Sequence, residues 1–65
     1  MNEFIFIQQP NGEYQITPVT FEQLWLASGT YFIAGQIVQV MQLEGDMYYI
    51  VEPRIADGTY IVDNV

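Results

Sequence analysis

Residues 31–43 decide the fold, and they read Tyr31-Phe32-Ile33-Ala34-Gly35-Gln36-Ile37-Val38-Gln39-Val40-Met41-Gln42-Leu43. The β-branched and aromatic side chains of this stretch are typical of β-strands. Gly35 interrupts the stretch and predicts a bulge or a bend. The segment is long enough for two strand pairings. Gly45-Asp46 follows it and predicts a type II′ turn, with the register Met41–Ile50, Leu43–Tyr48 and Val40–Val51.

Two further hairpins are expected on either side of this segment. The run from Phe4 to Ile7 is strongly β-prone, and Pro10-Asn11-Gly12 predicts a type I turn closed by a glycine bulge. This turn sets the register Phe6–Ile16 and Gln8–Tyr14. Near the other end of the chain, Asp57-Gly58 predicts a type I′ turn that joins residues 54–56 to residues 59–62.

A short helix is expected between the first hairpin and the long segment. Thr20 is a candidate N-cap, and Gln23 stands three residues later, as a capping box requires. Phe21, Leu24 and Trp25 recur at helical spacing, so we expect them to share one face that packs on the sheet. Val19 and Leu24 are expected to form a hydrophobic staple and Gly29 to end the helix, and Trp25 is assigned to the core.

The expected fold is α+β and mainly β, with the element order β-β-α-β-β-β. Several strands are apolar on both faces, and one two-turn helix cannot cover the second face. We therefore expect a small bent antiparallel sheet or an SH3-like barrel, with residues 1–65 as a single domain without an internal repeat. A 65-residue chain with no Cys has no disulfide to stabilise it, which favours a homodimer.

The composition argues against most chemistry. The chain has no Cys and no His, so thiolate metal sites and the usual neutral-pH acid–base group are excluded. Glu44 and Asp46 are the nearest carboxylate pair, but they flank a tight turn, and Asp57 is explained by its turn. We therefore expect no enzyme activity, no metal and no cofactor. The N-terminus carries no basic residue and apolar runs are short, so a cytoplasmic protein without a membrane segment is expected.

Charge suggests the partner. The chain has eight Asp and Glu against Arg54 as its one cation, which gives a net charge of −7. Direct binding to nucleic acid is therefore not expected, because that affinity depends on Lys and Arg. Carboxylates can instead act as surrogates for phosphate on a basic protein partner, although single carboxylates spread along a chain also serve solubility. In composition, the chain is similar to the small acidic proteins by which phages and mobile elements inhibit nucleases or polymerases.

The predicted partner-binding residues lie at one hairpin tip. Glu44, Asp46, Tyr48 and Tyr49 combine carboxylates with tyrosines within a few residues. Carboxylates steer an encounter, and desolvated tyrosines supply affinity. The predicted function is a non-enzymatic acidic interaction module, a phage or mobile-element inhibitor of a nucleic-acid-binding protein. The alternative is a structural, self-assembling subunit with no other target.

Overall fold

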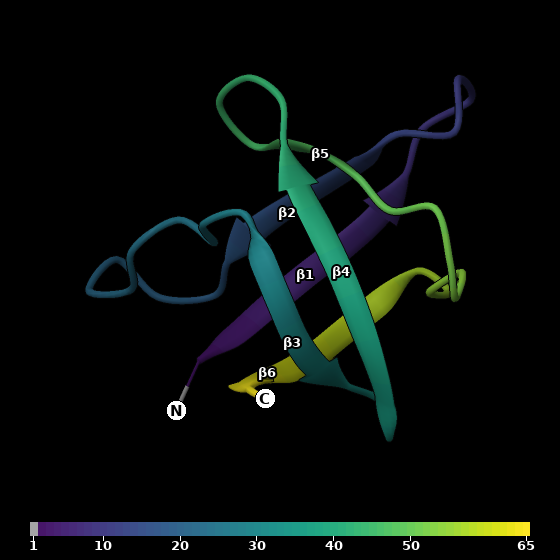
Figure 1. Ribbon diagram of the computed structural model, residues 1–65. Helices are drawn as coiled ribbons and strands as arrows, with labels where there is room; N and C mark the ends of the chain where they lie inside the picture. The colour runs from purple at the N-terminus through teal and green to yellow at the C-terminus, as the bar shows by residue number, and fades with distance from the viewer. Residues whose placement is uncertain (1) are drawn as a thin grey trace.

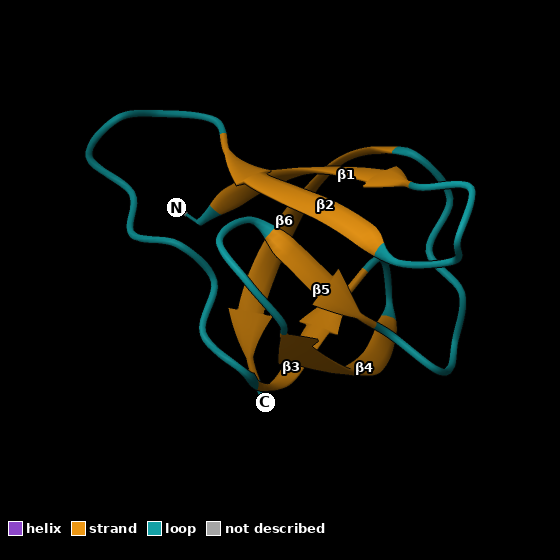
Figure 2. Ribbon diagram, turned by 90° about the horizontal axis from the view of Figure 1, so that it is seen from above, coloured by secondary structure: helices purple, strands orange, loops and turns teal. Residues whose placement is uncertain are grey.

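The computed structural model describes residues 2–65, which form six antiparallel strands closed into a barrel (Figure 1). The strands are β1 Glu3–Gln8, β2 Tyr14–Pro18, β3 Gly29–Ile33, β4 Gln36–Gln42, β5 Met47–Tyr49 and β6 Gly58–Asn64. Around the barrel the order is β1-β2-β5-β4-β3-β6, and β6 pairs with β1 (Figure 2). No helix occurs in these residues, so the expected α+β fold of order β-β-α-β-β-β is wrong. The coarser expectation of a small β protein is confirmed.

The first hairpin has the predicted register. Phe6 lies opposite Ile16 and Gln8 opposite Tyr14. Gly12 has φ +92°, and its N–H donates to the carbonyl of Gln9 at 2.9 Å. A glycine is required there because other residues rarely adopt positive φ. The hairpin was predictable because the turn residues and the apolar alternation agree.

The bend expected at Gly35 is a tight turn. Ala34 and Gly35 both have positive φ, at 51° and 76°, and Ile33 pairs with Gln36. Two central residues with positive φ are the signature of a two-residue hairpin turn whose twist matches that of the strands. The long β-prone segment is therefore two strands, β3 and β4.

The β4–β5 hairpin differs from its predicted register by one residue. Gln42, not Leu43, lies opposite Tyr48. The turn between Leu43 and Met47 holds three residues rather than two. The N–H of Leu43 donates to the carbonyl of Met47 at 2.9 Å, and the N–H of Met47 donates to the carbonyl of Glu44 at 2.9 Å. A slip of one residue exchanges the two faces of a strand. Tyr48 therefore points into the core and Tyr49 points outward.

The hairpin expected at Asp57-Gly58 is also wrong, because residues 50–57 form a long connection and β6 pairs with β1 and β3. The expected helix is a loop. Its capping contacts exist, since the N–H of Thr20 donates to Oε1 of Gln23 at 3.1 Å and the N–H of Gln23 donates to the carbonyl of Thr20 at 3.3 Å. A single turn without a buried face does not propagate into a helix. The barrel completes its core without these residues.

The barrel has an internal two-fold pseudosymmetry. Exchanging β1 with β4, β2 with β5 and β3 with β6 leaves the neighbour order unchanged. The core follows the same relation. Within residues 2–65, twelve apolar side chains are buried, and each one in the first half has a counterpart at the equivalent position of the second half. The equivalent positions are Phe4 and Val38, Phe6 and Val40, Tyr14 and Tyr48, Ile16 and Ile50, Leu26 and Ile55, and Ile33 and Val62. Each half, β1–β3 or β4–β6, thus consists of a hairpin, a connection that crosses the barrel, and a third strand. We call the chain between β2 and β3 the first crossover connection and the chain between β5 and β6 the second.

A short repeat accompanies this symmetry and corrects the expectation of none. Residues 27–31 read Ala-Ser-Gly-Thr-Tyr and residues 56–60 read Ala-Asp-Gly-Thr-Tyr. Each tyrosine hydroxyl donates to the carbonyl of the alanine four residues earlier, at 2.8 Å for Tyr31 and 2.7 Å for Tyr60. The two motifs fasten the ends of both crossover connections to the strands that follow them.

The two crossover connections are also held by the opposite half of the chain. The hydroxyl of Tyr48, in the second half, donates to the carbonyl of Leu26 in the first connection. The hydroxyl of Tyr14, in the first half, accepts from the N–H of Ile55 in the second connection at 3.0 Å. Both contacts are buried, so each half fixes the crossover of the other.

Candidate protein-binding site

The structure does not bring the four predicted site residues onto one surface. Glu44 is exposed in the β4–β5 turn, and Tyr49 is half-exposed on the outer wall of the barrel. Asp46 is half-buried, and its carboxylate accepts from Nε2 of Gln15 at 2.7 Å. Tyr48 is fully buried. Glu44 and Tyr49 remain available to a partner, whereas Tyr48 belongs to the core.

Burial also governs the chemistry of Tyr48. Desolvation raises the pKa of its phenol, and the nearby Tyr31 raises it further, while the hydrogen bond to the carbonyl of Leu26 lowers it. Desolvation is the largest of these effects because an apolar interior disfavours the phenolate. The side chain therefore stays neutral and donates its proton to the backbone, which is a structural role.

The first crossover connection is longer than its equivalent in the other half. Nine residues, 17–25, separate Ile16 from Leu26, whereas four residues, 51–54, separate the equivalent Ile50 from Ile55. Both connections deliver one buried side chain to the core. The additional five residues are therefore not needed to close the barrel.

This longer connection carries three exposed apolar side chains. Phe21 is fully exposed, Leu24 is 85% exposed and Trp25 is 52% exposed. The assignment of Trp25 to the core is therefore wrong, and Leu26 is the residue that enters the core instead. Val19 is half-exposed as well, so the expected staple with Leu24 is absent. We call residues 19–25 the apolar loop, and Figure 2 shows it projecting away from the barrel.

Two hollows lie beside Trp25. One, of about 570 Å³, is lined by Leu24, Trp25 and Tyr31 among others, and a second, of about 300 Å³, is lined by Pro18, Phe21 and Trp25 among others. A flat partner surface cannot fill such hollows, whereas side chains of a partner that close around Trp25 can. The loop is thus an apolar projection with concave surfaces beside it.

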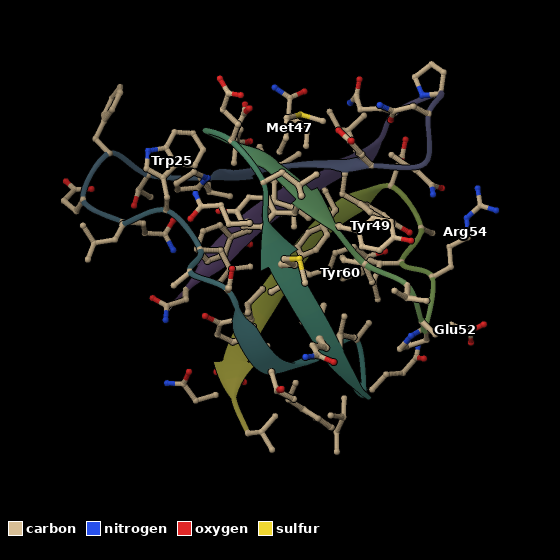
Figure 3. All side chains as sticks on the ribbon, turned by 45° about the horizontal axis from the view of Figure 1, so that its top comes forward. Trp25, Met47, Tyr49, Glu52, Arg54 and Tyr60 are labelled. Carbon is tan, nitrogen blue, oxygen red and sulfur yellow. The ribbon has the colours of Figure 1, made fainter. Side chains whose placement is uncertain are left out.

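The charge near the loop is acidic. Glu22 lies within it, and the backbone of Glu3 anchors it, since the N–H of Val19 donates to the carbonyl of Glu3 at 3.0 Å. Arg54, the one Lys or Arg in the sequence, lies on the other side of the barrel from Trp25 (Figure 3). A partner that covers the apolar loop therefore meets carboxylates and no cation.

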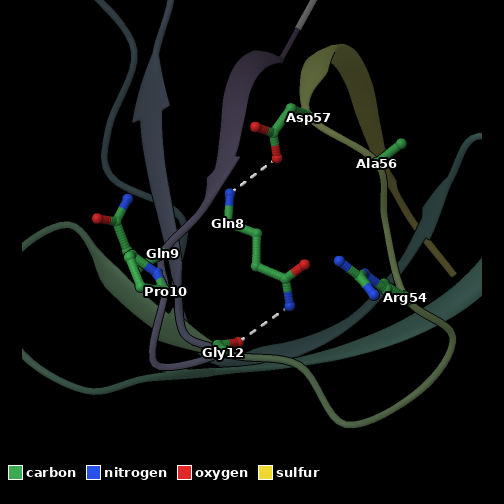
Figure 4. Close-up of a pocket in the computed structure, with 7 residues that line it drawn as sticks. All are labelled: Gln8, Gln9, Pro10, Gly12, Arg54, Ala56 and Asp57. Atoms are coloured by element: carbon green, nitrogen blue, oxygen red, sulfur yellow. Dashed lines mark hydrogen bonds between the residues drawn. The ribbon is translucent and has the colours of Figure 1, made fainter.

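Arg54 lines another hollow, of about 810 Å³, together with Gln8, Gly12 and Asp57 (Figure 4). Several polar groups that line it already form hydrogen bonds within the protein. The N–H of Gln8 donates to Oδ1 of Asp57 at 2.9 Å, and Nε2 of Gln8 donates to the carbonyl of Gly12 at 3.3 Å. The hollow is open, and a guanidinium offers hydrogen-bond donors but neither a nucleophile nor a base at neutral pH.

Sequence reasoning missed the apolar loop because helical spacing also occurs in a loop. The repeat at residues 27–31 and 56–60 was the available signal, because aligning the two motifs exposes the five extra residues before the first. Over residues 2–65, the structure has no group of carboxylates placed to hold a metal ion and no helix long and apolar enough to cross a bilayer. In comparisons with known proteins, no family model, no curated protein and no solved structure matches this chain.

Proposed function

We propose that this protein is a non-enzymatic interaction module that inserts its apolar loop into a partner protein with a basic surface. The observation that carries the proposal is the five-residue excess of the first crossover connection, which holds Phe21 and Leu24 in solvent next to Trp25. Large exposed apolar side chains that the fold does not require are typical of interaction sites. The binding site is therefore the apolar loop rather than the β4–β5 turn.

In this proposal the apolar loop supplies the binding affinity, and the net charge sets the association rate. Full burial of a large apolar side chain contributes about 1.5–3 kcal/mol, so Phe21, Leu24 and Trp25 can supply most of the affinity. The net charge of −7 accelerates the encounter with a cationic surface and makes the association rate fall as salt rises. A nucleic-acid-binding protein offers such a surface, and the carboxylates then occupy positions that phosphates would take. The proposal places the protein in the cytoplasm as an inhibitor of viral or mobile-element origin.

The test uses the loop variant Phe21→Ser/Leu24→Ser and a matched control, Ile61→Ser. Ile61 is an exposed apolar residue of β6, on the barrel wall and outside the loop. The wild-type protein, immobilised and exposed to host lysate, should capture a nucleic-acid-binding protein that added double-stranded DNA or RNA displaces. The loop variant should lose this capture, and the control should retain it.

A second measurement uses Trp25, which is the only tryptophan in the chain. Its fluorescence should shift to shorter wavelength when the captured partner is titrated in, because the indole leaves water. Capture that survives in the loop variant, or that neither salt nor competing nucleic acid affects, contradicts the proposal. Recovery of only this protein itself favours the structural subunit instead.

A further inference from the structure

The barrel wall is incomplete beside β4. On its β3 side, β4 has five register pairs, from Val40–Gly29 to Gln36–Ile33. On its β5 side it has two, Met41–Tyr49 and Gln42–Tyr48. In the other half of the barrel, the equivalent β1–β2 hairpin has five pairs. The difference arises because β5 ends at Tyr49 and the chain then diverges from β4 (Figure 1).

The hydrogen-bond pattern shows which groups face this gap. The N–H of Leu43 donates to Met47 of the β5 side, whereas the N–H of Gln42 donates to Oγ of Ser28 at the β3 side. Backbone groups alternate in direction along a strand, so those of Ile37 and Gln39 point to the β5 side. Within residues 2–65, neither residue has a hydrogen-bond partner on that side.

The sequence of this edge makes its exposure a hazard. Residues 36–42 read Gln-Ile-Val-Gln-Val-Met-Gln, without a charge, a proline or a glycine. Uncharged β-prone segments on an open edge are templates for pairing with another chain, and natural proteins usually block them with Lys, Pro or a bulge. None of these devices is present. Ile37 and Met41 also expose 60% and 55% of their side chains on the outer face.

The distribution of charge indicates which molecule pairs with the open edge of β4. No residue from 23 to 43 is charged, so all nine charged residues lie outside the segment that contains β3 and β4. Two molecules of net charge −7 can therefore approach through this face with the least repulsion between their carboxylates. The geometry points to a second copy of this chain, whose β4 pairs antiparallel with β4 of the first across a two-fold axis at Val38.

One register satisfies every open group. It places Ile37 of each copy opposite Gln39 of the other, and the two N–H and two C=O groups of each copy then form four hydrogen bonds in all. The four bonds use no backbone group that is already paired, because those of Ile37 and Gln39 on this side have no partner within residues 2–65. Ile37 of the second copy becomes the diagonal neighbour of Met41, within reach of an apolar contact.

The adjoining groove fits this arrangement. A hollow of about 210 Å³ lies beside the open edge and is lined by Gln39, Met41, Tyr49, Val51 and Glu52. Ile37 of the second copy enters from the Gln39 side. Because the pairing is isologous, it uses both edges and stops at two molecules. Glu52 on the rim makes the dimer tighten as salt rises, which is the opposite of the salt dependence proposed for the basic partner.

The test compares two substitutions that add the same charge to exposed isoleucines. Ile37→Glu places like charges near the two-fold axis, whereas Ile61→Glu changes β6, which is paired on both sides. In sedimentation equilibrium at micromolar concentration, the wild type and Ile61→Glu should have twice the chain mass of 7.5 kDa, about 15 kDa. Ile37→Glu should have the mass of one chain with an unchanged circular dichroism spectrum.

Hydrogen exchange identifies the pairing itself. The amides of Ile37 and Gln39 should be protected in the wild-type dimer and should lose protection on dilution and in Ile37→Glu. A further variant, Gln39→Pro, removes the edge donor without removing a bond to β3, and it should be a folded monomer. A monomeric wild type, a dimer that persists in Ile37→Glu, unprotected edge amides or species that grow beyond two copies would each overturn the inference.

Discussion

Deletion of Thr20–Leu24 is the sharpest test of how the molecule divides into scaffold and binding element. The shortened first connection then has four residues between Ile16 and Leu26, as the second has between its two core residues. Within the deleted segment, Gln23 and Thr20 are joined by hydrogen bonds that leave together with it. A hydrogen bond from the N–H of Val19 to Oε1 of Gln23 at 3.2 Å crosses the boundary, but the same N–H also donates to the carbonyl of Glu3.

The expected change in stability is small. Shortening a flexible connection about two-fold reduces its closure entropy and stabilises the fold by about 0.6 kcal/mol. Phe21 and Leu24 contribute little burial because both are exposed, and the lost contact to Val19 costs about 0.5–1.5 kcal/mol at most. These effects nearly cancel. The melting temperature should move by less than about 8 °C, the shift that corresponds to roughly 1 kcal/mol in so small a domain.

Urea unfolding followed by circular dichroism measures this change, with Leu26→Ala as the control. Leu26 is buried, so its truncation should cost about 2–5 kcal/mol in the same assay. The deletion should keep the slope of the unfolding transition and abolish capture of the partner. If the deletion costs as much as Leu26→Ala, the loop is part of the scaffold, and our reasoning about the excess residues fails.

Three other expectations concern the barrel. Tyr14→Phe and Tyr48→Phe should each lower the free energy of unfolding by about 1–3 kcal/mol, because each leaves a buried backbone group without its partner. Tyr31→Phe and Tyr60→Phe remove exposed hydrogen bonds and should each lower it by about 1 kcal/mol or less. Urea titrations measure both effects. Burial raises the pKa of Tyr48 above its ordinary 10.0, so the folded state keeps a proton that the unfolded state loses. Stability should therefore hold below about pH 10 and fall above it, and this loss should be smaller in Tyr48→Phe. Ala34→Gly should raise the melting temperature, since φ of +51° costs a non-glycine residue about 1 kcal/mol.

The sequence predicts those parts of the fold where local signals agree. In the first hairpin, Gly12 and the alternation around Phe6 and Ile16 require the same register. Where two turns fit the same residues, the outcome depends on packing of distant strands. The register at Tyr48 was of this kind, because a three-residue turn and a two-residue turn both suit Gly45 and only burial against the rest of the barrel separates them.

The helix and the site failed for a related reason. Phe21, Leu24 and Trp25 have helical spacing and a capping contact, but a helix forms only if its apolar face is covered. The core was already complete with twelve side chains from the strands and from Leu26, Ile50 and Ile55 of the connections. The same three residues therefore lie in solvent, and what resembled a packing element became the candidate binding element.

The reciprocal tyrosine contacts have a consequence for how the chain acquires its structure. The hydroxyl of Tyr48 bonds to the first connection and the hydroxyl of Tyr14 bonds to the second. Neither half of the sequence can therefore satisfy its buried backbone groups without the other half. Closure also needs β1 to meet β6 at the far end of the chain. A peptide that carries only one half should remain unfolded, and the whole chain should fold in one cooperative, comparatively slow step that is set by contacts between distant residues.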